Sequence, residues 1–338
     1  GDPVFNALLG GNDPQAGFMD ALFDGMKESR QRYLPNTAIL ETTIECAGGT
    51  ARIFAFAPRF RRFGRMFRPP MLMRRLEPVA GRPRVTLRLR PTFQYGARNA
   101  QVTMGSNHIR YYGDAAVLRL TTDASLNYVL HETEFSLDRP LTLIVGADES
   151  ITDNVDQLSR SFLSETEIYW QGWVRDLNIP FDWQVAVIRA AITLKLCSYE
   201  DTGAVLAALT TSVPEAAGTV RNWDYRFTWL RDAFFTVTAL NRLSATRTME
   251  SYVRFIIDVV EAGSARGEVE SVAPLFPIAP GTDTVERLIE SLPGYRGYGP
   301  VRIGNAAVGQ RQNDVYGSMV LTAAQMFWDE RLPRQGDV

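Results

Sequence analysis

The spacing of apolar residues changes near Asp153, and this change constrains the fold more than any other feature of the 338-residue chain. Ahead of it, short β-branched and apolar runs are separated by turn residues. Residues 85–90 alternate strictly between apolar and polar, as a strand with one buried face does. Beyond it, the pattern over residues 153–178 is helical. The sequence therefore predicts a β domain followed by an all-α domain.

The N-terminal part predicts a β-sandwich over residues 1–150. A short loop and an amphipathic helix around residues 15–26 are expected to precede the strands, and Gly48 and Gly49 mark a turn between the first two. The strands themselves are expected at residues 37–45, 52–56, 85–90, 117–121 and 141–145.

The C-terminal part predicts helices joined by one long connection. A linker helix occupies the segment 151–180, in which Pro180 interrupts it, and a helical domain follows over residues 181–338. Residues 272–304 are rich in Pro and Gly and indicate a long ordered loop, a kind of loop that is often functional. The helices of the domain are expected at residues 183–199, 228–243, 248–262 and 312–330, with Pro333 ending the last.

Composition argues against several classes of function. The net charge of −2 gives no electrostatic reason to expect a nucleic-acid partner. No apolar run approaches the roughly 20 residues of a membrane span. The two histidines, His108 and His131, lie in different β segments, which argues against a histidine-based metal site. Cys46 and Cys197 lack metal-ligand spacing, so we expect two buried free thiols, no metal and no cofactor.

One segment, residues 59–68, mixes five arginines with aromatic residues, and Arg74 and Arg75 follow it. Such a composition could bind RNA by stacking and charge. The chain is slightly acidic overall, however, and the segment lies between expected strands. We therefore favour a solvated or interdomain hairpin whose arginines extend into solvent.

Residues 221–232 carry the strongest chemical signal, because two Trp, a Tyr and a Phe stand among three Arg and two Asp. Aromatic faces stack on the apolar faces of sugar rings, while Arg and Asp divide the hydroxyls between donor and acceptor. The run continues into the apolar segment 233–240, so Arg231 and Asp232 are expected at a helix N-terminus. Composition alone also fits a packed corner of the core with a simple Arg–Asp salt bridge.

The order of residues around this motif resembles glycoside hydrolase family 15 in its bacterial form, the family of glucoamylases, glucodextranases and trehalases. The resemblance implies a supersandwich and an (α/α)6 toroid, of which this chain supplies about four helices. It also implies a fragment truncated at both ends, since residues 2–10 resemble a point inside the family's first domain. The matching blocks are residues 211–216, 221–226 and 229–232, then 292–297, 300–307 and 312–317.

The resemblance further implies an inverting, exo-acting α-glucosidase that releases glucose from the non-reducing ends of α-glucans or oligosaccharides. One carboxylic acid protonates the leaving oxygen while a second carboxylate activates water. The family's two catalytic glutamates follow the block at 312–316, and the sequence ends at Val338 before either is expected. We therefore expect no catalytic residue and no glucosidase activity in this chain alone. The nearest candidates, for which we expect structural roles, are Glu215, Glu286 and Glu290.

Substrate-binding residues are implied in the same way. Arg231 and Asp232 would hold the hydroxyls of the terminal glucose. Tyr225 matches a tyrosine near the catalytic water, and Trp229 matches an aromatic residue beside the pocket. The other candidates, for the pocket or its support, are Trp223, Arg302, Asn305 and Asp314.

Two alternatives stay open. A trehalase of the same family would hold the same terminal glucose through Arg231 and Asp232, with a disaccharide as its substrate. A non-catalytic sugar-binding or scaffold protein would bind sugar without chemistry. We expect a cytoplasmic bacterial protein, and the sequence leaves its oligomeric state and the presence of a signal peptide open.

Overall fold

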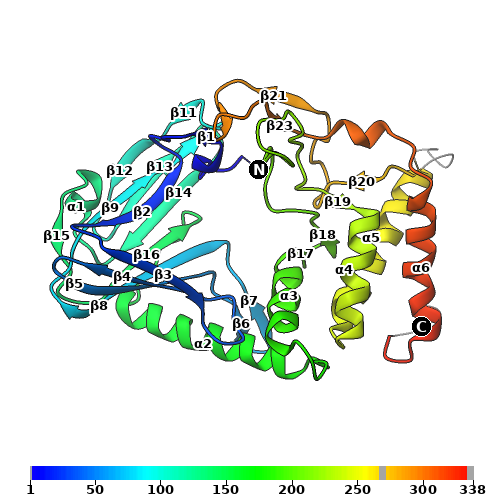
Figure 1. The fold of residues 1–338 in the computed structure, drawn as a ribbon, viewed down its shortest axis with the longest axis horizontal. Helices are drawn as coiled ribbons and strands as arrows, with labels where there is room; N and C mark the ends of the chain where they lie inside the picture. The colour runs from blue at the N-terminus through cyan, green and yellow to red at the C-terminus, as the bar shows by residue number, and fades with distance from the viewer. Residues whose placement is uncertain (1, 266–271, 333–338) are drawn as a thin grey trace. The chain divides into compact units, whose positions relative to one another are not determined.

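The computed structural model describes residues 2–265 and 272–332, and the chain divides into two compact units, Gly1–Arg175 and Asp176–Val338. The first unit is rich in β-sheet, and the described part of the second contains four α-helices (Figure 1). The predicted order, a sheet-rich part followed by a helical part, is confirmed. The finer boundaries near residues 150 and 180 stay predictions.

Two antiparallel sheets make up most of the first unit. The expected strands at 37–45, 52–56, 117–121 and 141–145 belong to the larger sheet, and the strand at 85–90 belongs to the smaller. The smaller sheet has the order β15 (Phe135–Ser136), β9 (Arg84–Arg90) and β2 (Phe18–Phe23). The larger has the order β12 (Gln101–Met104), β13 (His108–Tyr112), β14 (Val117–Thr122), β16 (Leu141–Gly146), β8 (Met71–Gly81), β5 (Gly49–Phe56), β4 (Leu40–Cys46) and β3 (Glu28–Tyr33).

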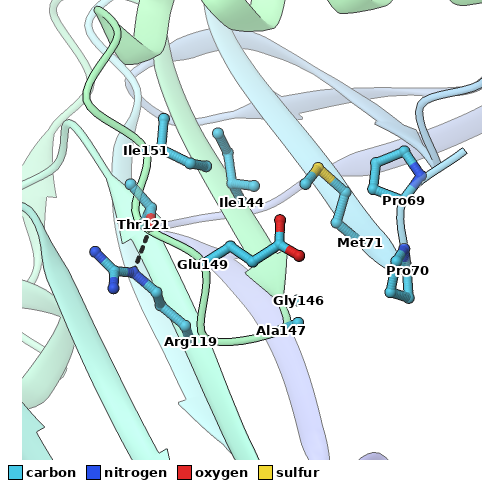
Figure 2. A pocket seen from close by; sticks show the side chains of 10 residues that line it. All are labelled: Pro69, Pro70, Met71, Arg119, Thr121, Ile144, Gly146, Ala147, Glu149 and Ile151. Atoms are coloured by element: carbon cyan, nitrogen blue, oxygen red, sulfur yellow. Dashed lines mark hydrogen bonds between the residues drawn. The ribbon is translucent and has the colours of Figure 1, made fainter. Parts of the chain in front are cut away.

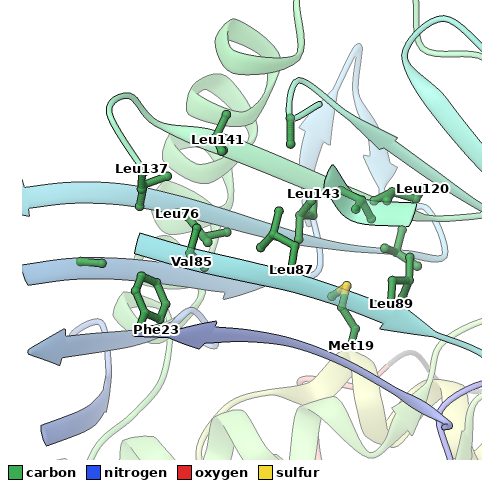
Figure 3. Packing of buried hydrophobic residues seen from close by; sticks show 14 of the residues in the cluster. Met19, Phe23, Leu76, Val85, Leu87, Leu89, Leu120, Leu137, Leu141 and Leu143 are labelled. Atoms are coloured by element: carbon green, nitrogen blue, oxygen red, sulfur yellow. The ribbon is translucent and has the colours of Figure 1, made fainter. Parts of the chain in front are cut away.

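The apolar core of this unit lies between the two sheets (Figure 3). Along β9, Val85, Leu87 and Leu89 are buried while the residues between them are half-buried, so the predicted alternation is confirmed. On the larger sheet, Leu76 and Leu143 belong to the same cluster. Full burial of one such side chain contributes roughly 1.5–3 kcal/mol, which makes this cluster the main source of stability in the unit.

Helix α2 (Val155–Arg175) covers the opposite face of the larger sheet, where Phe162 packs against Met73. Inside this contact Arg75 of β8 is buried, and its Nη1 donates to Asp156 Oδ1 and to the Ser159 hydroxyl, both at 2.7 Å. The helix predicted over residues 153–178 is thus confirmed, and it is held to the sheet by apolar packing and by a buried ion pair.

The predicted amphipathic helix around residues 15–26 is wrong. These residues contain strand β2, which pairs with β9 in the register Phe18↔Arg90 to Phe23↔Val85. Met19 and Phe23 are the buried residues of the strand, and they are four positions apart. A spacing of four fits one face of a helix and one face of a strand equally well. The tertiary pairing with β9 decides between them.

Strand β8, with 11 residues, was not foreseen, because Arg74 and Arg75 interrupt its apolar pattern. Both arginines are satisfied inside the protein. Arg74 Nη1 donates to the Met19 carbonyl oxygen at 2.6 Å, and Arg75 Nε donates to Glu77 Oε1 at 2.8 Å. The two side chains point to opposite faces of the sheet, as neighbouring residues of a strand do. At these two positions of a central strand, arginines with hydrogen-bond partners stand where apolar residues are usual. The apolar pattern that would have predicted the strand is therefore interrupted.

The arginine-rich segment 59–68 forms the hairpin of β6 (Phe60–Arg62) and β7 (Arg65–Phe67). The rings of Phe60 and Phe67 pack against each other at a centroid distance of 4.9 Å and an interplanar angle of 31°, and both contact Phe162 of α2. The hairpin tip from residue 61 to residue 65 is exposed. The hairpin favoured from the sequence is therefore present, with aromatic residues anchoring it and the arginines of its tip in solvent.

The last three described helices of the second unit share one apolar cluster, which joins Leu230 and Val237 to Tyr252, Ile256 and Val315. The predicted end of the last helix at Pro333 lies outside the described residues. The remaining helix predictions are confirmed by α3 (Gln184–Leu196), α4 (Leu230–Arg242), α5 (Thr246–Ala265) and α6 (Asp314–Trp328).

The predicted loop at 272–304 is organised by short strands. β20 (Leu275–Phe276) pairs with β19 (Thr228–Trp229), and β21 (Arg287–Ile289) pairs with β23 (Val301–Ile303). Because β19 runs directly into α4, the pairing fixes part of the loop beside the N-terminus of that helix. The other short strands of the unit are β17 (Ser198–Tyr199), β18 (Ala204–Val205) and β22 (Gly294–Tyr295).

Helix α6 carries an exposed apolar stripe, while Val315, Ser318 and Thr322 are its buried residues. Phe327 and Trp328 are 80% and 82% exposed. Exposed apolar side chains on a helix form a surface that another element can cover. The α6 stripe consists of Tyr316, Val320, Leu321, Phe327 and Trp328.

The first unit should lose stability as the pH falls below about 4. Hydrogen bonds from Arg75 hold the pKa of Asp156 below its ordinary value, and hydrogen bonds from Arg90 do the same for the pKa of Glu132. Since both pKa values are lower in the folded state, the unfolded chain takes up protons first as the pH falls. The stability present at neutral pH is then lost between the unfolded and the folded pKa values.

Thermal unfolding followed by circular dichroism between about pH 7 and pH 3 measures this loss. The Tm of Asp156→Asn should depend less steeply on pH than that of the unchanged protein, because one linked proton is removed. Equal slopes for the two proteins would contradict the assignment.

Candidate functional site

The sequence motif at 221–232 leads into helix α4, whose N-cap residue is Trp229 in an extended conformation. Arg231 and Asp232 occupy the first turn of the helix, so their predicted position at a helix N-terminus is confirmed. The positive end of the helix dipole stabilises a carboxylate at this place.

Arg231 joins the two sequence blocks. Its Nη1 donates to Asp314 Oδ2 at 2.5 Å and approaches Gln312 Oε1 at 3.4 Å. The hydrogen bond from Arg231 holds the pKa of the Asp314 carboxyl below its ordinary value. Both side chains of the pair are nearly half exposed. Because a guanidinium has five N–H groups, Arg231 keeps donors for a ligand while it binds Asp314.

Asp232 is exposed, and no described side chain forms an ion pair with it. It therefore presents a free anionic acceptor one residue after Arg231 in the first turn of the helix. A carboxylate that accepts and a guanidinium that donates are the two kinds of group needed to bind neighbouring hydroxyls of a sugar.

Aromatic residues of the same motif lie together. The rings of Tyr225 and Trp229 have a centroid distance of 6.3 Å, and both residues are half-buried. Within the described residues the Trp229 indole N–H has no hydrogen-bond partner. Trp223 is half-buried as well, and the guanidinium of Arg221 lies 5.5 Å from the centre of its ring.

The Tyr225 hydroxyl donates to Glu215 Oε1 at 2.8 Å. Burial, followed by this hydrogen bond to Glu215, raises the pKa of Tyr225 to about 12. The phenol therefore stays protonated at all ordinary pH values. Glu215 also binds Arg221, so a residue for which only a structural role was expected connects two members of the motif.

Asp224 is the buried centre of the site and was not singled out from the sequence. Its carboxylate accepts from Arg226 Nε and Nη2, both at 2.9 Å, and from the Gly304 N–H at 3.2 Å. Its carbonyl oxygen accepts from Asn305 Nδ2 at 3.0 Å. Asn305 is buried and caps the following 3₁₀ turn through Ala307 N–H, so it supports the site and does not line it.

Arg302 also braces the two blocks. Its Nη1 donates to Glu286 Oε1 at 2.7 Å, and its Nε approaches Asn222 Oδ1 at 3.4 Å. Its backbone N–H donates to the Ser212 hydroxyl at 2.7 Å. The candidates therefore divide into two groups: the supports Arg302 and Asn305, and the accessible or half-accessible Trp223, Tyr225, Trp229, Arg231, Asp232 and Asp314.

The hollow beside Arg119 and Ile144 in the first unit is too small for a sugar. It has a volume of about 20 Å³, room for a single water molecule. Figure 2 shows the Glu149 side chain reaching between Ile144 and Met71, while Arg119 turns to Thr121, to which its Nε donates at 3.2 Å. A hexose does not fit there.

Two further classes of site are not found in the described ranges. Across residues 2–265 and 272–332, no three His, Cys, Asp or Glu side chains gather as ligands for a metal ion. Over the same ranges, no helix has both the length and the apolar character needed to cross a bilayer. Of the two free cysteines, Cys46 is buried as expected, and Cys197 is only partly buried.

Residues 183–337 match the model of the glycosyl hydrolases family 15. A trehalase from Mycobacterium tuberculosis is 30% identical over 348 residues, which cover 94% of this chain and 50% of the relative. A trehalase from Mycolicibacterium smegmatis is 29% identical, with 94% and 51% covered. A trehalase from Thermoplasma acidophilum is 30% identical, with 74% and 43% covered. The chain spans about half the length of the curated relatives it matches.

The family match covers the helical unit that contains Arg231, Asp232 and Asp314, and the similarity to two of these relatives extends along nearly the whole chain. Together with the two sequence blocks that meet in the structure, these matches identify the helical part of the chain, residues 183–337, as belonging to glycosyl hydrolases family 15.

Proposed function

We propose that this chain provides the sugar-recognition part of a trehalase, a glycosidase that hydrolyses the disaccharide trehalose. The observation that carries the proposal lies at the start of α4. There the free carboxylate of Asp232 follows Arg231, whose guanidinium binds Asp314 through Nη1 and keeps further N–H groups for a ligand. This pair would bind neighbouring hydroxyls of one glucose unit, and Tyr225 and Trp229 would border the sugar ring.

We propose trehalose as the substrate in place of the α-glucan ends that we favoured from the sequence. The geometry of Arg231 and Asp232 suits a terminal glucose in either substrate, so the site itself does not separate the two. The similarity to trehalases from Mycobacterium tuberculosis, Mycolicibacterium smegmatis and Thermoplasma acidophilum favours the disaccharide. The inverting mechanism, with one carboxylic acid and one carboxylate as base, is proposed with the family.

The architecture expected of the family is proposed as well. The two facing sheets of the first unit are compatible with a supersandwich. The helices of the second unit would contribute to an (α/α)6 toroid, in which each helix contacts neighbours on both sides. The α6 stripe supports this proposal, because an apolar helix face requires a neighbour of its own.

The proposed function is tested by isothermal titration calorimetry, which measures the dissociation constants of trehalose, maltose and cellobiose for the 338-residue chain. We expect trehalose to bind at least about tenfold more tightly than cellobiose, because α- and β-linked glucose place the second ring differently against a preformed site. Tighter binding of maltose than of trehalose would contradict the proposed trehalase function and favour a glucoamylase-like function. Failure to bind all three sugars would contradict sugar recognition by this chain.

A further inference from the structure

We infer that Glu215 is a positioning residue that makes the Tyr225 hydroxyl oxygen an acceptor for one particular sugar hydroxyl. The inference rests on the proposed sugar-binding function. It begins with the two oxygens of Glu215, which have separate partners. Oε1 accepts from the Tyr225 hydroxyl at 2.8 Å, and Oε2 accepts from Arg221 Nε at 3.0 Å and Nη2 at 2.8 Å. Glu215 therefore lies between a cation and a phenol.

The direction of the hydrogen bond from Tyr225 follows from charge. Hydrogen bonds from Tyr225 and then from Arg221 hold the pKa of Glu215 below its ordinary value, so the carboxylate is ionised at neutral pH. An ionised carboxylate can only accept, and a phenol has one hydrogen. That hydrogen is committed to Glu215, which leaves the Tyr225 oxygen with lone pairs alone. A sugar hydroxyl that meets Tyr225 must then donate.

The backbone around Glu215 keeps this arrangement in place. The Glu215 N–H donates to the Arg221 carbonyl oxygen at 2.9 Å, which closes the loop 215–221 at its base. Tyr225 in turn follows the buried Asp224, whose four donors fix the backbone at that point. Both ends of the Tyr225–Glu215 hydrogen bond are thus held by other contacts, and the free lone pairs of the phenol have a defined direction.

A purely structural Glu215 would act differently. As a partner of the exposed Arg221 it would contribute a surface ion pair, which has little effect on stability and none on the choice between donor and acceptor at Tyr225. The positioning role and the purely structural role of Glu215 can therefore be distinguished with a ligand that cannot donate a hydrogen bond to Tyr225. Fluorine in place of a hydroxyl group is such a ligand, because it carries no hydrogen.

Dissociation constants for glucose and for its 2-, 3-, 4- and 6-deoxyfluoro analogues, measured by NMR titration of the 338-residue chain, provide the test. We expect one analogue to bind about fivefold more weakly than glucose, the effect of one lost hydrogen bond. In Glu215→Ala the phenol hydrogen is released, so Tyr225 no longer requires a donating hydroxyl and this penalty should become smaller. Tyr225→Phe should abolish it. Glu290→Ala, a change of the same type at an exposed residue, should leave the penalty unchanged.

The outcomes separate this inference from the proposed function. If the chain binds glucose and every analogue equally, the acceptor role of Tyr225 is overturned while sugar binding stands. If the penalty is the same in Glu215→Ala as in the unchanged chain, the positioning role of Glu215 is overturned. If the chain binds neither glucose nor trehalose, the proposed function and the inference fail together.

Discussion

Replacing Asp232 by asparagine should weaken trehalose binding by about 10- to 100-fold, because charge-assisted hydrogen bonds to sugar hydroxyls contribute roughly 1.5–3 kcal/mol each. The Asp232 carboxylate is exposed in the first turn of α4 and is free of described ion pairs. Asparagine keeps the shape of the side chain and replaces one acceptor oxygen by a donor. The change should be measured by calorimetric titration with trehalose.

The matched change at the neighbouring position is Arg231→Lys. A lysine ammonium cannot bind Asp314 and a sugar hydroxyl in the planar arrangement that the guanidinium allows. We expect it to reduce affinity as well. The rival explanation treats Arg231 and Asp232 as structural residues of the helix start. It requires both variants to lose thermal stability while the folded protein keeps its affinity, so melting curves of the same two samples decide the question.

Removal of the Asp224 carboxylate should have the largest effect on stability in the helical unit. The side chain is 1% exposed, and Asp224→Ala removes the hydrogen bonds that it accepts from the guanidinium of Arg226 and from the N–H of Gly304. Breaking a buried pair by removing one partner costs about 3–5 kcal/mol. Urea unfolding of the variant, followed by tryptophan fluorescence, should show the loss as a lower midpoint.

Asp283→Ala is the control for this change, since Asp283 pairs with Arg287 at 3.1 Å on the surface and both side chains are more than half exposed. Its removal should change the free energy of unfolding by at most about 0.5 kcal/mol. Equal effects of the two substitutions would mean that burial of Asp224 contributes nothing to stability.

The sequence predicted the parts of this fold in which local pattern and tertiary contacts agree. Residues 85–90 alternate because one face of β9 lies on the core, and the helix at 153–178 has an apolar side that faces the larger sheet. Strand β2 was missed because Met19 and Phe23 fit both periods, and only the pairing with β9 decides between them. Such pairing involves residues far apart in sequence, which a local pattern does not contain.

The candidate site divides in the same way. Arg231 and Asp232 could be placed at a helix N-terminus from the apolar run that follows them. The role of Asp224 could not be predicted, although it lies within the same motif, because Gly304 and Asn305 bury it from 80 residues further along the chain. Charge and aromaticity, the two features that mark this motif, do not distinguish a residue that would contact a ligand from one that holds the backbone beneath it.

The two neighbouring arginines of β8 have a consequence for how the larger sheet assembles. Leu76 belongs to the core between the sheets, while Arg75 reaches Asp156 and Ser159 on α2. A slip of β8 by one residue against β5 and β16 would exchange these faces. It would bring the charge of Arg75 into the leucine-rich layer and separate it from its acceptors on α2, Asp156 and Ser159. The paired charge on one face of β8 therefore selects against a one-residue misalignment of this strand with its neighbours.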